Sequence, residues 1–163
     1  LLVIFNILES FLNNKNINNA LDLYSGTSVL GIFISKYVKN VISIESNPDA
    51  VVDAIENIKI NNINNLKVIN GRVEDYINNF NNIDLIIVDP TRYGLDKKTI
   101  KYLKDIKSKY LIYIACGIDS LKRDLSLLKD CYNTEKIYGI DMFPSTNNVE
   151  CISLLSLKND KKQ

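Results

Sequence analysis

The chain has 163 residues, of which 46% are apolar, and its net charge is +1. This size and composition predict one globular domain, and the small net charge excludes binding to nucleic acid through overall charge alone. The absence of histidine excludes histidine-based acid–base catalysis and histidine-ligated metal sites. Three cysteines without paired spacing argue against disulfide bonds and favour a reducing compartment, so we expect a cytoplasmic location.

Leu1–Leu12 has the pattern of an amphipathic helix, and it is too short to cross a bilayer, so we expect no membrane contact. Strand-length apolar runs then alternate with helical patterns. In chain order, the predicted elements are strand Ala20–Tyr24, helix Val29–Tyr37, strand Val41–Glu45, helix Pro48–Asn61, strand Leu66–Asn70, helix Val73–Phe80, strand Ile83–Asp89, helix Lys97–Lys107, strand Tyr110–Ala115, helix Asp119–Asp130, strand Glu135–Asp141 and strand Val149–Leu157. This order predicts a doubly wound, mostly parallel α/β sheet with an antiparallel edge formed by its last strands.

Ligands of doubly wound sheets bind outside the carboxyl ends of the strands, and several polar residues are predicted to lie there. Gly26 follows the first strand, in a turn where glycine lets the backbone approach a ligand and where helix amides point outward. Glu45 ends the second strand, about 20 residues later, where a carboxylate usually holds a ribose. Arg72 and Glu74 follow the third strand, where an adenine would lie, and Asp89 follows the fourth.

Together these residues predict a site for a nucleotide-like cofactor. Taken singly, the Gly26 turn also fits an ordinary connection between a strand and a helix, and Glu45 also fits a solvated helix cap. The turn contains no basic residue and no Gly-Lys-Ser/Thr motif. That composition argues against a triphosphate and favours an adenosine ligand without phosphates.

Cys116 and Glu150 carry the reactive groups of greatest interest. Cys116 follows a predicted strand and precedes a predicted helix, whose amino terminus would favour the reactive thiolate. Glu150 lies in an apolar strand, where burying an unpaired carboxylate is costly and therefore suggests a functional role. A thiol nucleophile and a carboxylate base beside a cofactor indicate covalent chemistry on an unreactive ring. The alternative for Cys116 is a small side chain buried in the core, which is the role that we assign to Cys131 and Cys151. The alternative for Glu150 is a side chain that faces water on an edge strand.

Four motifs occur in order along the chain, at Leu21–Thr27, Val88–Asp96, Tyr113–Leu125 and Asp141–Cys151. They resemble the motifs of the RNA uridine-5-methyltransferases, which transfer a methyl group from S-adenosylmethionine to carbon 5 of a uridine in tRNA or rRNA. The resemblance implies a Rossmann-like methyltransferase fold and catalysis through a covalent cysteine adduct. It implies that Cys116 is the nucleophile and Glu150 the base. The implied cofactor-binding residues are Tyr24, Gly26, Glu45 and Asp89.

RNA, either tRNA or rRNA, is the expected partner, and we expect a monomer without a metal ion. The family carries an amino-terminal RNA-binding barrel, which this sequence does not include. The first residue is not methionine, so we expect residues 1–163 to be the catalytic domain at the end of a longer protein. Arg92 is a candidate contact to phosphate, and Phe143 is a candidate wall of the base pocket. The sequence departs from the family pattern at Ser28, Thr91 and Gly117-Ile118, and again at Ser145, Asn147 and Asn148.

Two other functions stay open on the sequence alone. A different S-adenosylmethionine-dependent methyltransferase could act on an exocyclic or ring nitrogen of a nucleic acid through the loop that contains Asp89 and Pro90, and it would need no cysteine. A catalytically inactive relative could instead bind RNA or a protein partner, which the changed Gly117-Ile118 pair would allow.

Overall fold

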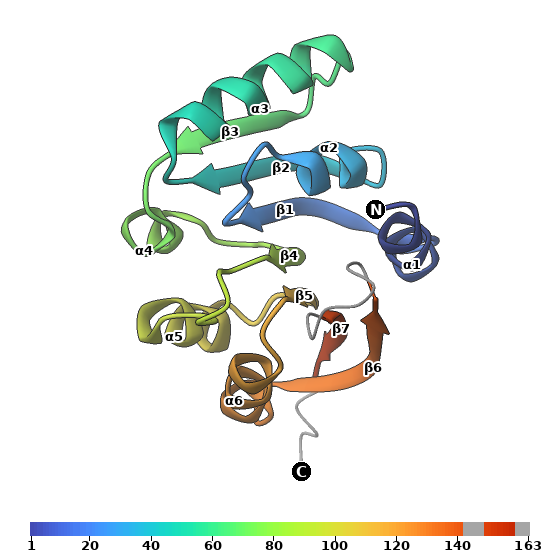
Figure 1. Ribbon diagram of the computed structural model, residues 1–163, viewed down its shortest axis with the longest axis vertical. Coiled ribbons are helices and arrows are strands. Elements are labelled where there is room, and N and C mark those ends of the chain that lie inside the picture. The colour runs from blue at the N-terminus through green and yellow to red at the C-terminus, as the bar shows by residue number, and fades with distance from the viewer. Residues whose placement is uncertain (142–148, 159–163) are drawn as a thin grey trace.

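The chain folds around one seven-stranded sheet (Figure 1). The computed structural model describes residues 1–141 and 149–158. The strands are β1 (Ile17–Leu23), β2 (Val38–Glu45), β3 (Leu66–Asn70), β4 (Leu85–Val88), β5 (Tyr110–Ala115), β6 (Tyr132–Ile140) and β7 (Glu150–Leu157). Their order across the sheet is β3-β2-β1-β4-β5-β7-β6. The first five strands are parallel, and β7 is antiparallel to both of its neighbours, which confirms the predicted fold class.

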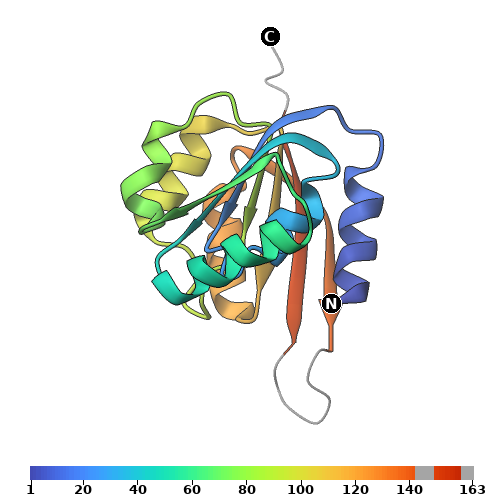
Figure 2. The ribbon, with the colours of Figure 1, turned by 90° about the horizontal axis from the view of Figure 1, so that it is seen from above.

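Helices cover both faces of the sheet, as Figures 1 and 2 show. On one face lie α1 (Leu2–Leu12), α2 (Val29–Ile34) and α3 (Pro48–Ile60). On the other lie α4 (Val73–Tyr76), the short 3-10 helix η1 (Ile77–Asn79), α5 (Lys97–Ile106) and α6 (Ile118–Leu128). Right-handed crossovers change face when the strand order reverses, and it reverses here between β1 and β4. Sheets of this kind bind ligands at that reversal point.

The central strand β4 shows how the sheet divides the core. Successive side chains of a strand point to opposite faces. Leu85 and Ile87 belong to the apolar cluster that includes α1 and α2, whereas Ile86 and Val88 belong to the cluster that includes α5 and α6. All four are fully buried, as expected for a parallel strand covered on both sides.

Local sequence sets the starts of two helices. The Asn47 side chain accepts a hydrogen bond from the backbone N–H of Asp49 at 3.0 Å, and Pro48 occupies the first turn of α3. The Asp96 carboxylate accepts a hydrogen bond from the backbone N–H of Lys98 at 2.7 Å at the start of α5. Both helices begin at the predicted residue.

The last two strands form the antiparallel edge that the sequence predicts, with β7 between β5 and β6 and with β6 outermost. The segment Cys151–Leu155 of β7 is buried and is apolar except for Ser153, as expected for a strand inside the sheet. Several elements begin or end a few residues from the predicted bounds. The helix α2 ends at Ile34, where the next residue, Ser35, turns its hydroxyl back to a carbonyl oxygen of the helix. No helix among the described residues is long and apolar enough to cross a membrane.

Candidate active site

The carboxyl ends of the parallel strands bring the predicted cofactor residues to one edge of the sheet. In the register of the sheet, Leu23 at the end of β1 pairs with Ile44 of β2 on one side and with Val88 of β4 on the other. Tyr24, Glu45 and Asp89 each lie one residue further along. A cavity of about 380 Å³ opens at this edge. Its lining residues are Leu1, Ile4, Tyr24, Ser25, Gly26, Thr27, Val29, Leu30, Asp89, Ile114 and Glu150.

The turn after β1 repeats the left-handed backbone conformation at every second residue. The angle φ is +61° at Tyr24, +53° at Gly26 and +57° at Ser28. A Cβ atom at Gly26 would meet no atom within 4 Å, so its surroundings are open toward the cavity. Ser28 is fully buried and adopts a left-handed conformation that favours glycine. This conformation explains why the family usually has glycine at this position. The Ser28 backbone N–H donates to the Ser25 carbonyl oxygen at 2.8 Å.

Glu45 ties this turn to the end of β2. One of its carboxylate oxygens, Oε2, accepts a hydrogen bond from the Gly26 backbone N–H at 2.8 Å. The other, Oε1, accepts one from the Asn47 backbone N–H at 2.7 Å. Oε1 also accepts a hydrogen bond from the Ser46 hydroxyl at 3.3 Å. Oε2 keeps a second lone pair that can accept a hydrogen bond from a ribose hydroxyl. Glu45 is half-buried, so it shapes the turn and also remains open to a ligand.

Asp22 lines neither cavity but lies buried close enough to Asp89 and Glu45 to feel their charges, and the sequence did not single it out. It is fully buried, and its Oδ2 accepts hydrogen bonds from the Gly31 backbone N–H at 3.0 Å and the Ser43 hydroxyl at 3.2 Å. Its Oδ1 has no hydrogen-bond partner among the described residues. Burial raises the pKa of Asp22 to about 7, despite these two hydrogen bonds. The available signal was a carboxylate between Leu21 and Leu23 in an apolar strand.

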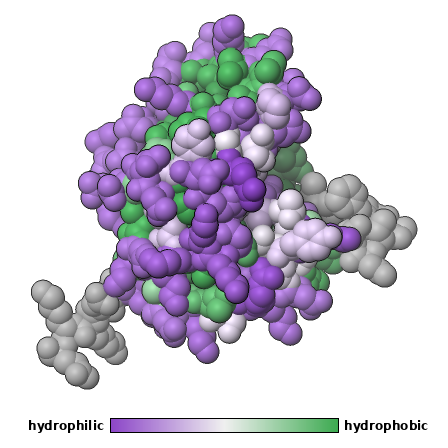
Figure 3. All heavy atoms as spheres, turned by 90° about the vertical axis from the view of Figure 1, so that its left-hand side faces the viewer, coloured by the Kyte–Doolittle hydropathy of each residue, from purple (hydrophilic) through white to green (hydrophobic). Residues whose placement is uncertain are grey.

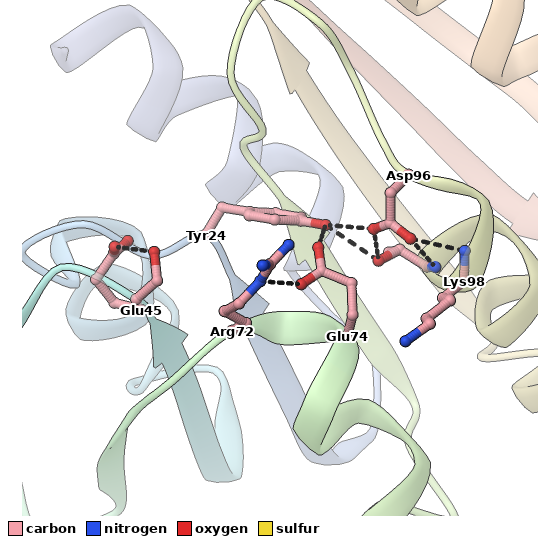
Figure 4. A network of polar contacts seen from close by, with 8 residues as sticks. Tyr24, Glu45, Arg72, Glu74, Asp96 and Lys98 are labelled. Carbon is pink, nitrogen blue, oxygen red and sulfur yellow. Dashed lines mark hydrogen bonds and ion pairs between the residues drawn. The ribbon is translucent and has the colours of Figure 1, made fainter.

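Tyr24 extends from the turn into a polar network on the α5 side (Figure 4). Its hydroxyl oxygen lies 3.0 Å from Thr99 Oγ1, 3.3 Å from Asp96 Oδ2 and 3.4 Å from Glu74 Oε1. Burial raises the pKa of Tyr24, so the phenol stays protonated. Thr99 and Asp96 were not among the predicted site residues.

A second cavity of about 360 Å³ adjoins this network. It is lined by Tyr24, Ile44, Ser46, Arg72, Val73, Glu74 and Thr91. Tyr24 lines both cavities and therefore lies between them. Arg72 and Glu74 follow β3 and line this second cavity, on the side where the sequence predicts an adenine. Arg72 is exposed and its Nε lies 3.4 Å from Glu74 Oε2.

Asp89 and Glu150 bring two carboxyl groups to the first cavity. Asp89 as a residue is exposed, whereas its carboxyl group, at the cavity, is largely enclosed by protein. This burial, together with the charge of Glu150, raises the pKa of Asp89 to about 7. Glu150 is half-buried at the start of β7, and burial raises its pKa as well. Among the described residues, neither carboxylate accepts a hydrogen bond through its side chain, so both can interact with a ligand.

Cys116 lies just after β5, and Glu150 begins the neighbouring strand β7. The last residue pair between β5 and β7 is Ala115 with Cys151. Cys116 follows Ala115 and Glu150 precedes Cys151. In an antiparallel pair, these two positions therefore lie across from each other, one residue beyond the last pair. Glu150 lines the cavity. Cys116 is exposed to solvent and does not line the cavity. Cys151 is buried, as predicted for a small core side chain, whereas Cys131, for which the same was predicted, is only half-buried.

The segment after Cys116 contacts the loop after β4. The Ser120 hydroxyl lies 2.9 Å from the Arg92 carbonyl oxygen and 3.0 Å from the Gly117 carbonyl oxygen. A Cβ atom at Gly117 would lie only 2.7 Å from the Arg92 carbonyl oxygen. Glycine at this departure from the family pattern therefore permits close contact between the two loops. The candidate pocket wall Phe143 lies outside the described residues. Within residues 1–141 and 149–158, no group of three or more cysteine or acidic side chains could hold a metal ion.

Comparison with known proteins now bears on this site. The sequence pattern that defines the tRNA (uracil-5-)-methyltransferase family matches residues 5–158. The chain belongs to this family. It is 41% identical over 145 residues to an uncharacterized RNA methyltransferase of Lactobacillus johnsonii, covering 86% of this chain and 32% of that protein. The chain thus spans about a third of the length of such relatives.

Solved structures agree with the family assignment and with the fold. A tRNA (uracil-54, C5)-methyltransferase of Pyrococcus abyssi, in complex with S-adenosyl-L-homocysteine, is 30% identical with a TM-score of 0.81. The match covers 92% of this chain and 37% of that one. An rRNA methylase of Streptococcus thermophilus is 14% identical with a TM-score of 0.73, covering 94% and 95% of the two chains, which shows a shared fold.

Proposed function

We propose that this domain methylates carbon 5 of a uridine in tRNA or rRNA, with S-adenosylmethionine as the methyl donor and Cys116 as a covalent nucleophile. The observation that carries the proposal is the register of β5 and β7, which brings Cys116, just after the end of β5, across from Glu150, which lines the cavity at the start of β7. Another methyltransferase acting on a ring nitrogen would need no such pair. The family assignment gives the reaction class, and the residue roles are our inference.

The residues around the two cavities fit S-adenosylmethionine. Glu45 would accept hydrogen bonds from the ribose, beside the open space over Gly26. The second cavity would receive the adenine, next to Ile44 and Val73. Asp89 would face the positively charged methionine portion in the first cavity. The cofactor supplies an electrophilic methyl group on a sulfonium, and the protein supplies its position.

The protein side chains would act in a fixed order. The Cys116 thiolate adds to carbon 6 of uracil, which turns carbon 5 into a nucleophile. Carbon 5 then takes the methyl group as the methyl–sulfur bond breaks and S-adenosylhomocysteine is left. Glu150 removes the proton from carbon 5, and the bond between carbon 6 and Cys116 breaks to release the product. Burial favours this role, because a raised pKa makes the Glu150 carboxylate a stronger base.

RNA is the partner in this proposal, and the target base must leave its stack to reach Cys116. The chain would act as the catalytic domain of a longer enzyme, in line with the length of its relatives. Its three cysteines are free, which suits the reducing conditions of the cytoplasm.

The test compares variants of the complete protein incubated with a uridine-containing RNA and S-adenosylmethionine. Cys116→Ala should form neither product nor adduct, because the nucleophile is gone. Glu150→Gln should accumulate a methylated RNA–protein adduct that survives a denaturing gel, because the carbon 5 proton cannot be removed. Cys131→Ala is the matched control, since this half-buried thiol lies outside the site and should leave the reaction unchanged.

Each outcome has a clear meaning. Methylation of uridine by Cys116→Ala would exclude the covalent mechanism. An active Cys116→Ala that methylates a different base would favour the nitrogen methyltransferase. Full turnover by Glu150→Gln would show that another group removes the proton. Wild-type protein that binds RNA but never methylates it would favour the inactive relative.

A further inference from the structure

The loop after β4 presents an aromatic side chain to solvent. Tyr93 is 79% exposed, more than any other large hydrophobic residue among those described. Its hydroxyl makes no hydrogen bond to any residue in the described part of the chain. The loop turns at Gly94, which has φ of +77° and donates its N–H to the Thr91 carbonyl oxygen at 2.8 Å. The Tyr93 side chain therefore contributes little to the fold.

The backbone that carries Tyr93 is nevertheless held firmly by α6. Arg123 Nη2 donates to the Tyr93 carbonyl oxygen at 2.9 Å. The fully buried Asp124 carboxylate accepts a hydrogen bond from the Leu95 backbone N–H at 2.8 Å and another from the Tyr113 hydroxyl at 2.6 Å. A buried carboxylate satisfied in this way is costly to disturb. The exposed ring thus stands on a preorganised support.

The same loop adjoins the proposed nucleophile. The Arg92 carbonyl oxygen contacts Ser120 Oγ at 2.9 Å and would lie 2.7 Å from a Cβ atom at Gly117. Gly117 directly follows Cys116. Tyr93 therefore stands one residue from the point where the loop contacts the segment of the proposed nucleophile.

An exposed arginine stands next to the ring. Arg92 precedes Tyr93, is exposed and forms no ion pair within the described residues. Arg123, which binds the Tyr93 carbonyl, is ion-paired with the buried Asp124 at 2.7 Å, so its charge is largely offset. Figure 3 shows that the face formed by α4 and α5 is mainly hydrophilic, with an apolar patch above it over α3. An aromatic ring beside an exposed, unpaired arginine suits a polyanion with stacking bases better than an apolar protein surface.

We propose that Tyr93 stacks against an unpaired nucleobase next to the target uridine, while Arg92 contacts the adjoining phosphate. This inference rests on the proposed function, because it requires an RNA substrate at Cys116. Stacking on an aromatic side chain tolerates different bases and fixes the strand beside the flipped nucleotide. Tyr93 would then be a positioning residue that selects single-stranded or loop RNA.

The test measures the affinity of the complete protein, loaded with S-adenosylhomocysteine, for a synthetic RNA hairpin with one uridine in its loop. Tyr93→Ala should weaken binding by about 5- to 100-fold, the range expected for loss of one stacked base. Tyr93→Phe should bind like wild type, because the ring is kept. Tyr93→Leu should resemble Tyr93→Ala, because its side chain is apolar but not aromatic.

Two further hairpins identify the stacked base, one abasic just before the uridine and one abasic just after it. The wild-type protein should bind one of these two hairpins more weakly than the intact hairpin. With that hairpin, Tyr93→Ala should lose no further affinity. Ile60→Ala is the matched control, since Ile60 is 68% exposed at the end of α3, near the opposite edge of the sheet. S-adenosylhomocysteine affinity and the thermal midpoint should be unchanged in every variant.

The outcomes separate this inference from the function on which it rests. Wild-type protein that methylates the hairpin, with equal RNA affinity in wild type and Tyr93→Ala, would overturn the stacking role alone. So would independent effects of Tyr93→Ala and the abasic sites. Wild-type protein that neither binds nor methylates uridine RNA would overturn the proposed function, and the stacking role would fall with it.

Discussion

The carboxyl groups of Asp89 and Glu150 line the same cavity, and the charge of Glu150 adds to the effect of burial in raising the pKa of Asp89 to about 7. The two residues come from distant parts of the chain, since Asp89 follows β4 and Glu150 begins β7. Their proximity makes the charge of the cavity depend on pH near neutrality. Cofactor binding should report this dependence.

The affinity for S-adenosylmethionine should rise as the pH increases through about 7, because Asp89 ionises above its raised pKa and its carboxylate attracts the sulfonium cation. Glu150→Gln removes the nearby negative charge and should shift the midpoint to lower pH. Calorimetric titration on both sides of neutrality measures this effect. S-adenosylhomocysteine, which lacks the sulfonium charge, should show a weaker dependence. Equal midpoints in wild type and Glu150→Gln would contradict the coupling.

Glu45→Ala should weaken binding of S-adenosylhomocysteine by about 1–3 kcal/mol, because a ribose hydroxyl would lose its acceptor. The same change frees the Gly26 N–H, which Glu45 holds at 2.8 Å. Calorimetry can compare it with Glu56→Ala, a matched glutamate exposed on α3 that should have no effect. Unchanged affinity in Glu45→Ala would reject the ribose assignment.

Asp22 should make the stability of the domain depend on pH. Its pKa is raised from 3.8 to about 7, so the folded state binds the proton more tightly than the unfolded state. The stabilisation that protonated Asp22 gives is fully present below about pH 4 and is lost as the pH rises through about 7. This rise in pKa makes the free energy of unfolding change by up to about 4 kcal/mol over that pH range.

Asp22→Asn should remove this pH dependence, because an amide does not titrate. The fold should be kept, because the amide oxygen can still accept the hydrogen bond from the Gly31 N–H. Urea unfolding at several pH values would show a flatter stability profile for Asp22→Asn than for wild type. Asp53→Asn, at an exposed position on α3, is the control and should keep the wild-type profile. Identical profiles for Asp22→Asn and wild type would argue against a raised pKa.

Tyr113→Phe should lower the free energy of unfolding by about 1–3 kcal/mol, because the buried Asp124 would lose one hydrogen-bond donor. The Tyr113 hydroxyl donates to Asp124 Oδ2 at 2.6 Å. Chemical denaturation would measure the loss. Tyr138→Phe is the control, since the Tyr138 hydroxyl makes no hydrogen bond within the described ranges, and it should unfold like wild type. Equal stabilities of the two variants would show that Asp124 does not depend on this hydroxyl.

The sequence by itself determined most of the architecture. Strands β3 and β5 have the predicted boundaries, and α3 and α5 begin at the predicted residues. These features depend on local signals, such as apolar periodicity and the capping side chains of Asn47 and Asp96. The order of strands and helices also placed Tyr24, Glu45 and Asp89 at one edge, because parallel strands all end on the same side of a sheet.

Only the tertiary structure decided which distant groups meet. The insertion of β7 between β5 and β6 brings Glu150 next to the end of β5, and strand order is not encoded in local patterns. Tyr24 reaches Thr99, 75 residues away in the sequence, only once α5 packs against the sheet. Asp22 likewise gained a raised pKa from burial under α2 and β2, a property of the packed core rather than of its neighbours in sequence. Local sequence therefore fixed where each side chain stands in its own element, and non-local packing determined its partners and its charge.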